Sequence, residues 1–202
     1  MKKNKTDIRI FDKTTIDDLK WPDNPQAHTA RKYLRPLIRN GVKHYIRNTG
    51  VRMLALKIDD MVLPVTICDK PCYEDSYIAS PYTHYISYVR EEIIRLKKPG
   101  IKIVLDPFLT LLGTLFKRLH IDRVVIINNW LFSTIIYPDF TECQVRAITG
   151  YMTAMYPRHT ILFRCISRSL TGRLMDLLKT DNYQMIVSRP VFIVDPKSRI
   201  CF

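Results

Sequence analysis

The chain has 202 residues, of which 47% are hydrophobic and 25% are charged, a globular composition that excludes a disordered or fibrous protein. Its 32 Lys and Arg residues outnumber its 19 Asp and Glu residues, and the net charge of +13 favours an anionic partner of unspecified class. The longest uncharged run, Val124 to Pro138, is shorter than the roughly 18 residues that a membrane-spanning helix needs, so no span is expected.

The N-terminal region predicts an arm followed by a helix. Residues 1–24 are polar and predict an arm of low order that ends in a turn-rich segment. Residues 25–202 are expected to form a single domain. Apolar side chains at three- and four-residue steps predict a helix over 27–48, which begins near Arg35 if Pro36 occupies its first turn.

Strands and helices alternate along the rest of the chain. Apolar runs at 53–58 and 61–67 flank Asp59-Asp60 and predict an antiparallel hairpin. Periodicity and cap residues then predict, in chain order, a helix over 80–96, a strand over 101–105, a helix over 106–119, a strand over 124–127 with a second strand or continuation over 131–137, a helix over 141–155, a strand over 161–165, a helix over 170–178 and one or two strands over 182–195. This order predicts an α/β fold with a mixed, mostly antiparallel sheet flanked by helices.

A run of basic residues lies within the predicted first helix. No acidic residue occurs between Asp23 and Asp59, an interval that contains eight Lys and Arg residues. Five of these recur at four-residue steps and would line one helix face: Arg31, Arg35, Arg39, Lys43 and Arg47. This basic stripe is either a solvated face or an anion-binding surface for phosphates, a nucleic acid or anionic lipid. A nucleic acid is less favoured, because the stripe lacks interleaved exposed aromatics and no helix-turn-helix, zinc-finger or RNP pattern occurs.

Metal and phosphate motifs are weak. Cys68 and Cys72 have a tolerable zinc-ligand spacing, but no second Cys/His pair follows, so no metal is expected. The five cysteines instead predict free core thiols in a reducing compartment, and the chain is expected to be cytoplasmic. No Walker-type or Rossmann glycine motif occurs. The turn at Arg168 lies between a strand and a helix, where backbone N–H groups either bind an anion or are capped by Ser167 and Ser169.

Aromatic and acidic side chains concentrate at the start of the predicted helix over 80–96. At helical spacing Tyr85 and Tyr88 share a face, and Glu92 follows Tyr88 by one turn. The cluster is either a core stripe with its hydroxyls in water or a catalytic group. In the second interpretation Glu91 or Glu92 is a general base that acts through water, and Tyr85 or Tyr88 is the proton donor.

Three stretches carry a resemblance to a known family. They are Ser80-Pro81 with Tyr85, Tyr88 and Glu91-Glu92; Asn128-Asn129-Trp130-Leu131 with Ser133-Thr134 and Tyr137-Pro138; and Phe163-Arg164 followed by Leu174, Leu177, Leu178, Asn182-Tyr183, Ser188-Arg189 and Val191-Phe192. Over about residues 50–196 the chain resembles bacterial GNAT-type N-acetyltransferase-like proteins, in particular the N-terminal half of their tandem members. The resemblance implies a GNAT-like sheet with a strand-helix-strand unit beside an acyl-CoA.

The function that the resemblance implies is acyl transfer. An acyl group would move from acetyl-CoA or another acyl-thioester, carried by CoA or a carrier protein, to the amine of a small molecule or peptide. Asn128, Asn129, Ser133 and Thr134, together with Arg168, would then hold the acyl donor. A second GNAT-like domain is a further expected partner.

The chain also departs from the family pattern. The junction from Tyr137 to Thr141 has no glycine where the family has its pyrophosphate loop, and Leu178 stands where many members have a tyrosine acid. Glycines let backbone N–H groups approach phosphates. These departures favour a second hypothesis, a non-catalytic GNAT-like module that binds an anionic partner or completes another domain's active site. A gap between the central strands that side chains fill would favour the module, and an open gap lined by N–H groups would favour the enzyme.

Overall fold

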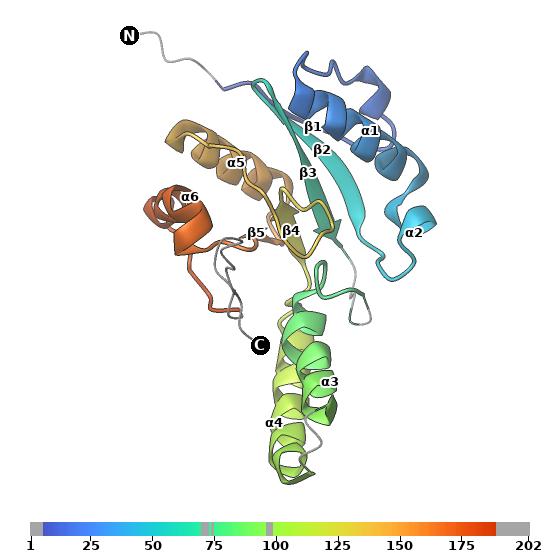
Figure 1. Ribbon diagram of the computed structural model, residues 1–202, viewed down its shortest axis with the longest axis vertical. Coiled ribbons are helices and arrows are strands. Elements are labelled where there is room, and N and C mark those ends of the chain that lie inside the picture. Colours follow the sequence, from blue (N-terminus) through green and yellow to red (C-terminus); the bar gives the residue numbers. More distant parts are fainter. Residues whose placement is uncertain (1–5, 70–72, 74, 96–98, 189–202) are drawn as a thin grey trace, which may run out of the picture.

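One five-stranded sheet organises the residues that the computed structural model describes, which are 6–69, 73, 75–95 and 99–188 (Figure 1). Its strands lie in chain order: β1 (Ile8–Phe11), β2 (Arg52–Ile58), β3 (Met61–Cys68), β4 (Val124–Ile127) and β5 (Thr160–Phe163). The first three neighbouring pairs are antiparallel, whereas β4 and β5 are parallel. The predicted α/β class with a mixed, mostly antiparallel sheet is therefore confirmed.

Helices cover both faces of this sheet and extend beyond one end (Figure 1). They are η1 (Ile16–Asp18), α1 (Pro25–Asn40) and α2 (Val42–Tyr45) on one face, α5 (Glu142–Met155) and α6 (Arg168–Thr180) on the other, and η2 (Thr83–Ser87), α3 (Tyr88–Arg95) and α4 (Pro99–Arg118) at the end. We call α3 and α4 the hairpin. It has its own small core and projects away from the sheet.

The two faces of the sheet follow from strict alternation along the strands. In β2, Met53 and Ala55 pack under α1, while Leu54 and Leu56 pack under α5 and α6. The four residues of β4 alternate in the same way and all are buried. Because β4 is apolar on both faces, its sequence reads as a continuous hydrophobic run, which is what made it predictable.

The N-terminal region is more structured than predicted. Residues 8–11, inside the expected arm, form β1 and pair with β2. The first helix begins at Pro25 because the Asn24 side chain accepts the N–H of Ala27 (2.8 Å), and it continues through Pro36. It ends at Asn40, since Gly41 has a φ of 86°, so the predicted helix over 27–48 is divided into α1 and the short α2.

Three predicted strands are wrong within the described residues. Residues 101–105 belong to α4, and residues 131–137 form an irregular loop. Residues 182–188 form no strand, and the rest of that prediction lies outside the described residues. The run Ile101-Lys-Ile-Val-Leu105 fits a strand by composition, but it forms early turns of α4, and residues 102–105 are exposed rather than paired in the sheet. Pro107, which suggested a helix start, lies inside α4.

The predicted hairpin of strands and two helix starts are confirmed. β2 and β3 pair along their length around Asp59-Asp60. Ser80 Oγ accepts the N–H of Thr83 (3.0 Å), as its cap role requires. Thr141 and Gln144 exchange hydrogen bonds and form the capping box that starts α5.

Candidate functional site at the carboxyl ends of β4 and β5

Polar side chains gather where β4 and β5 end. Asn128 and Asn129 directly follow β4, and Arg164 and Cys165 directly follow β5. Because these two strands are parallel, their carboxyl ends lie at one edge of the sheet, the place where open α/β sheets bind ligands. Asn128 and Asn129 are only 1% and 0% exposed, so this edge buries amide groups that need partners within the chain.

Asn129 is the centre of this polar cluster. Its amide nitrogen donates to Thr66 Oγ1 (2.8 Å) and to the carbonyl of Ile78 (3.1 Å). Its amide oxygen accepts the N–H of Leu131 (3.2 Å) and a guanidinium N–H of Arg164 (3.4 Å). The same guanidinium donates to the Ile78 carbonyl (2.8 Å). One buried side chain therefore joins β3, the start of the loop after β4, and the segment at Ile78.

Asn128 connects the cluster to the helix on the α1 face. Its amide nitrogen donates to the carbonyl of Ile136 (2.9 Å), and its amide oxygen accepts the indole N–H of Trp130 (2.8 Å). The hydroxyl of Tyr33 on α1 donates to the Trp130 carbonyl (2.6 Å). Partial burial raises the pKa of Tyr33, so it stays a hydrogen-bond donor well above neutral pH.

Tyr137 closes the gap beyond the strand ends. Its hydroxyl donates to the carbonyl of Arg164 (2.8 Å) and accepts the backbone N–H of Arg164 (3.0 Å). The loop after β4 is thereby attached to the chain after β5 through a side chain. Burial raises the pKa of Tyr137 far above its ordinary value. Tyr137 therefore occupies part of the space beyond the strand ends and pairs both backbone groups of Arg164.

Three non-glycine residues at this edge have left-handed backbone conformations. The φ angles are 56° at Asn128, 60° at Leu131 and 58° at Cys165. Asparagine adopts this region readily, but leucine and cysteine do so at a cost of roughly 1–2 kcal/mol each. Such strain concentrates at functional sites, which is the strongest sign that this edge has a role beyond folding.

The start of α5 is poorly suited to a pyrophosphate. The Thr141 hydroxyl accepts the N–H of Gln144 (3.3 Å), and the Gln144 side chain accepts the Thr141 N–H (3.0 Å). Gln144 also donates to Asp59 Oδ2 (2.8 Å), and Glu142 occupies the first turn. Two N–H groups are therefore used by the chain, and two carboxylates lie where an anion would bind.

The five predicted acyl-donor residues are only partly brought together. Asn128 and Asn129 form the cluster, whereas Ser133 and Thr134 are exposed in the loop after β4. The Ser133 carbonyl accepts the thiol of Cys165 (3.3 Å), which places it beside the end of β5. Arg168 is bound to Asp176 on the exposed side of α6 (2.8 Å).

The predicted base lies on the hairpin and is ion-paired. Glu91 and Glu92 both contact Arg95, at 4.0 and 3.1 Å, and both are on α3. The cluster at the strand ends contains neither of them. These pairs are typical of a solvated helix face.

The two predicted proton donors lie closer to the sheet. The ring of Tyr85 packs edge-on against Phe116 (centroids 6.5 Å apart), and burial raises the pKa of Tyr85. The ring of Tyr88 lies 5.5 Å from that of Tyr77, the neighbour of Ile78. Tyr88 is therefore linked to the polar cluster through two intermediate residues.

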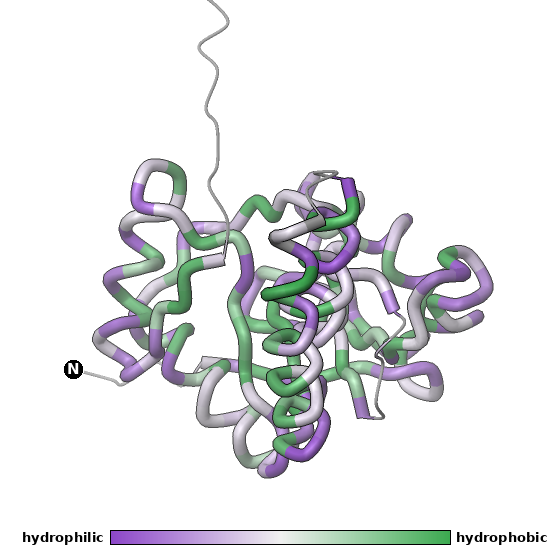
Figure 2. The backbone as a smooth tube through the Cα atoms, turned by 90° about the horizontal axis from the view of Figure 1, so that it is seen from below, coloured by the Kyte–Doolittle hydropathy of each residue, from purple (hydrophilic) through white to green (hydrophobic). Residues whose placement is uncertain are grey.

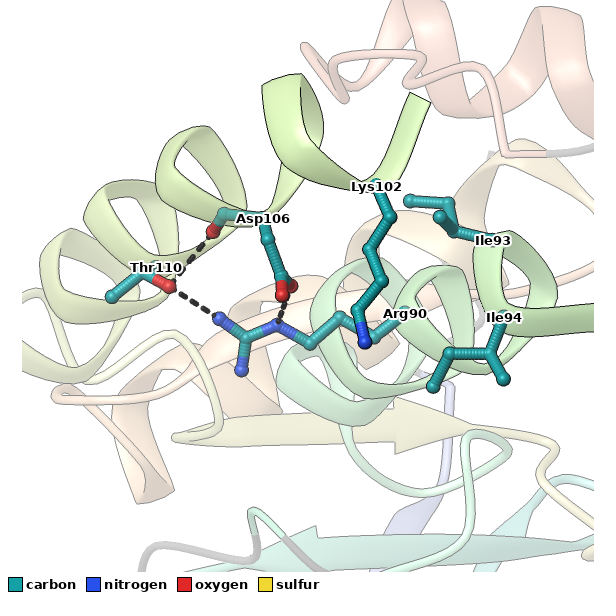
Figure 3. Close-up of a pocket in the computed structure, with 6 residues that line it drawn as sticks. All are labelled: Arg90, Ile93, Ile94, Lys102, Asp106 and Thr110. Atoms are coloured by element: carbon teal, nitrogen blue, oxygen red, sulfur yellow. Dashed lines mark hydrogen bonds and ion pairs between the residues drawn. The ribbon is translucent and has the colours of Figure 1, made fainter. Parts of the chain in front are cut away.

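A hollow of about 340 Å³ separates α3 from α4 (Figure 3). Arg90 reaches across it, donating to Thr110 Oγ1 (2.7 Å) and lying 3.5 Å from a carboxylate oxygen of Asp106. Lys102 points toward the same space. The hollow contains none of the predicted catalytic residues, and its main cation is already engaged by α4.

The basic stripe is divided by the break after Asn40. Arg35 forms a hydrogen-bonded ion pair with Asp17 (2.7 Å), and Arg39 lies 3.6 Å from the same carboxylate. The Arg35 hydrogen bond lowers the pKa of Asp17. Arg31, Lys43 and Arg47 are exposed and form no ion pair with any described residue. Tyr45, 49% exposed on α2, contradicts the expectation that the stripe lacks exposed aromatics.

Comparisons with protein-family models, with curated proteins and with solved structures found no match to this chain. Across the described ranges, no helix has both the length and the apolar character to cross a membrane. In that same part of the chain, no three His, Cys, Asp or Glu side chains are grouped to hold a metal ion.

The prediction of core thiols is only partly correct. Cys68 is buried, as expected, but Cys143 and Cys165 are exposed. The other two cysteines lie outside the described residues, as does the second half of the weak zinc pattern. Apolar neighbours in the sequence did not predict the exposure of Cys165, because this residue lies in a turn after β5.

Sequence reasoning did not assign site roles to Thr66, Tyr137 and Arg164. All three belong to the cluster, through contacts that join distant parts of the chain. A signal existed for Arg164, because an arginine that directly follows an apolar strand must find polar partners. Thr66 had no such signal, since threonine is ordinary in strands.

Proposed function

We propose that this protein is a non-catalytic module with a GNAT-like sheet, which binds an anionic partner through the surface of α1 and α2. The closed edge of the sheet carries the proposal. Tyr137 and Asn129 lie beyond β4 and β5 and form hydrogen bonds with polar groups there. An acyl-thioester would have to displace hydrogen bonds whose partners are buried, and the start of α5 would repel its phosphates.

The exposed members of the basic stripe form the binding surface. Arg31 lies on α1, Lys43 on α2 and Arg47 just after α2. Among the described residues, none of the three forms an ion pair with a carboxylate. Arg35 and Arg39 are different, because Asp17 already neutralises part of their charge. Unpaired exposed cations attract anions over about a Debye length, so these three residues supply most of the attraction.

The test is charge reversal of the three unpaired cations. The variant R31E/K43E/R47E is compared with wild type for the salt concentration that elutes each from heparin, a polyanion used here as the probe. A matched control, R158E/R173E/K179E, changes the same number of exposed charges elsewhere. Each replacement removes one positive charge and adds one negative charge, so the net charge of both variants falls by the same amount from +13.

The proposal expects earlier elution of the α1 variant than of the control. Arg35 and Arg39 are left intact, because a glutamate beside Asp17 would destabilise the fold for reasons unrelated to binding. Equal elution of both variants would show that only net charge matters and that the basic stripe is a solvated face.

Acyl transfer is the second candidate, and one observation favours it. β4 and β5 are the parallel pair in an otherwise antiparallel sheet, α5 connects them, and strained residues lie at both of their carboxyl ends. In this function an amine attacks the thioester carbonyl, the C–S bond breaks, and the thiol leaves with a proton. Backbone N–H groups at the strand ends would stabilise the oxyanion after Tyr137 moves away.

Isothermal titration with acetyl-CoA and with longer acyl-CoAs tests this second candidate. The Y137F variant removes the hydroxyl that closes the gap. Saturable binding that Y137F strengthens would support acyl transfer and count against the module. No heat of binding at millimolar ligand, for either protein, would reject it.

A further inference from the structure

An exposed aromatic ring lies among the cations of the basic stripe. Tyr45 on α2 is 49% exposed, and Lys43 and Arg47, two residues before and after it, are exposed and form no ion pair with any described residue. α2 lies at the far end of α1, on the outside of the molecule (Figure 1). We use the term α2 patch for six exposed residues of this region: Arg39, Asn40, Lys43, His44, Tyr45 and Arg47. The ring gives the patch a binding group that charge alone does not provide.

The neighbours of Tyr45 hold its ring in place. Its hydroxyl accepts a side-chain N–H of Asn40 (2.6 Å) across the break between α1 and α2. The His44 ring lies edge-on to it, at an angle of 83° and with the centroids 4.7 Å apart. Both contacts are at the surface, where a hydrogen bond adds little to stability because water competes for it. Their effect is to lower the entropy cost of ordering the ring when a ligand binds.

A row of cations leads along α1 to the ring. From Arg31 onward, arginines recur at four-residue steps, about 6 Å apart along the helix axis. A hollow of about 340 Å³ opens beside the α2 patch, lined by Arg35, Pro36, Arg39 and Asn40. Two carboxylates near the row are already engaged, since Asp17 binds Arg35 (2.7 Å) and Asp75 accepts the N–H of Gly50 (2.6 Å). A flexible polyanion can therefore follow the row over several of its charges.

The chemistry of the α2 patch indicates which polyanion fits it. Between residues 25 and 48, all of which the structure describes, Tyr45 is the one large apolar side chain that is exposed. Exposed apolar residues gather instead on the hairpin, which is nearest the viewer in Figure 2. A single ring is too little apolar surface to hold the patch in a bilayer. Acidic peptides and sulfated sugars repeat charges without a flat group beside each one, whereas nucleic acids combine phosphates with bases that stack on aromatic rings.

A single strand suits the α2 patch better than a duplex does. Paired bases are stacked inside a double helix, where a tyrosine on a protein surface does not reach their faces. α2 has four residues, which is too short to lie in a major groove as a recognition helix does. We infer that the α2 patch binds a single-stranded nucleic acid, with a base stacked on Tyr45 and phosphates at Arg39, Lys43 and Arg47. This role rests on the proposed function, since it names the anionic partner of that same surface.

Fluorescence anisotropy with labelled strands tests this inference on the full chain. The probes are an oligothymidylate, an oligouridylate and an abasic DNA strand of the same length. All three carry the same number of phosphates, but only the first two carry bases. Wild type should bind at least one base-bearing strand about tenfold more tightly than the abasic strand, which is the gain expected from base stacking. Comparison of the first two probes shows whether the preferred strand is DNA or RNA.

Variants of Tyr45 separate stacking from charge. Y45A should bind the preferred base-bearing strand about tenfold more weakly and the abasic strand as wild type does, because only the ring is removed. Y45F keeps the ring and should bind within about twofold of wild type. The matched control F108A removes a ring of similar exposure, 59%, from α4 and should bind as wild type does.

Removal of two cations should act on every strand alike. K43A/R47A should bind base-bearing and abasic strands more weakly. It should also reduce the slope of log affinity against log salt concentration by about 1.4, at about 0.7 for each phosphate contact.

Three results would overturn the inference. The first is wild type that binds base-bearing and abasic strands with equal affinity. The second is a Y45A variant that weakens on both kinds of strand alike, since the ring would then only shape the protein surface. The third is a duplex that binds as tightly as its single strand.

Heparin elution keeps this test apart from that of the proposed function. Y45A should elute from heparin at the same salt concentration as wild type, because its cations are intact. If R31E/K43E/R47E elutes no earlier than its matched control, the proposed function fails. If it does elute earlier and bases add nothing to strand affinity, only the single-stranded nucleic acid is rejected.

Discussion

The edge of the sheet at β4 and β5 and the face of α4 depart from ordinary packing in opposite ways. The edge buries two amides and a phenol and partly buries a guanidinium, whereas α4 exposes leucines and a phenylalanine. At the edge each of these groups has partners within the chain. On α4 five large apolar side chains, Val104, Phe108, Leu111, Leu115 and Leu119, keep between 48% and 72% of their surface exposed.

The difference separates structure from interaction. A buried polar group that is fully paired can be explained by the fold itself, because its partners repay its loss of water. An exposed apolar group gains nothing from the isolated chain, so its explanation has to come from something outside it. By this criterion the exposed face of α4 is evidence for a partner, whereas the paired polar groups at the edge are explained by the fold.

The largest expected loss of stability comes from replacing Asn129, the centre of the polar cluster at the strand ends. Asn129→Leu should lower the free energy of unfolding by about 3 kcal/mol, because it leaves Thr66, the Leu131 N–H and part of the Arg164 guanidinium without a partner in a buried site. Urea denaturation measures the change.

Asn48→Leu is the matched control for this substitution. Asn48 is exposed, so the change should stay within about 0.5 kcal/mol of wild type. If Asn129→Leu changed the free energy of unfolding as little as Asn48→Leu, water would reach the buried amides at the strand ends in solution. The gap would then be open enough for a ligand, and the contrast between a closed edge and an exposed α4 would be wrong.

The next effect separates the two faces of α4. Leu109→Ala should cost about 2 kcal/mol, because this side chain belongs to the hairpin's core. Leu111→Ala, two residues away and 72% exposed, should cost less than about 0.5 kcal/mol. Urea denaturation of both variants measures the two losses in the free energy of unfolding. Equal losses would mean that the side of α4 that carries Leu111 is already covered within the free protein.

Much of the fold was predictable where local signals and burial agree. The run Val124-Val-Ile-Ile127 and the capping pattern at Thr141 each predicted the correct element. The run at 101–105 misled, because β-branched residues favour a strand by composition, whereas this run continues into the long helix α4 and lies outside the sheet. β1 was missed since four residues next to a polar terminus carry little signal, and pairing with β2 decides their state.

The candidate site was predictable only in part. Asn128 and Asn129 stand out because two amides follow an apolar strand, and a buried amide requires partners. Their partners come from Thr66, Ile78 and Arg164, which only the strand order brings together. The predicted carboxylates were placed by helical spacing alone, and that spacing cannot show that α3 belongs to a projecting hairpin.

A smaller effect and a pH dependence are expected at Tyr137. Tyr137→Phe should cost about 1.5 kcal/mol, since the N–H and carbonyl of Arg164 both lose a partner. Burial raises the pKa of Tyr137 above its ordinary value of 10, so the folded state keeps a proton that the unfolded state releases. The stability that this proton gives is complete below pH 10 and falls as the pH rises above 10.

Unfolding in urea as a function of pH measures this contribution. Wild type should lose stability above pH 10, and Tyr137→Phe should lose it less steeply, by up to about 1.4 kcal/mol per pH unit. Identical slopes would show that the phenol is not buried in solution, and the edge would then be less closed than its contacts indicate.

The smallest effect tests whether the edge stores strain. Cys165 has a φ of 58° and an exposed side chain, so Cys165→Gly should raise the free energy of unfolding by about 0.5 kcal/mol, because glycine adopts this region without a clash. Cys143→Gly, in the first turn of α5, should instead lower it. Urea denaturation measures the sign of the change in the free energy of unfolding for both variants.

Stabilisation by Cys165→Gly would mean that the native sequence keeps a strained residue at the end of β5, which selection for stability alone does not explain. Destabilisation would mean that the bond from its thiol to Ser133 outweighs the strain, and the edge would then be as structural as its hydrogen bonds suggest.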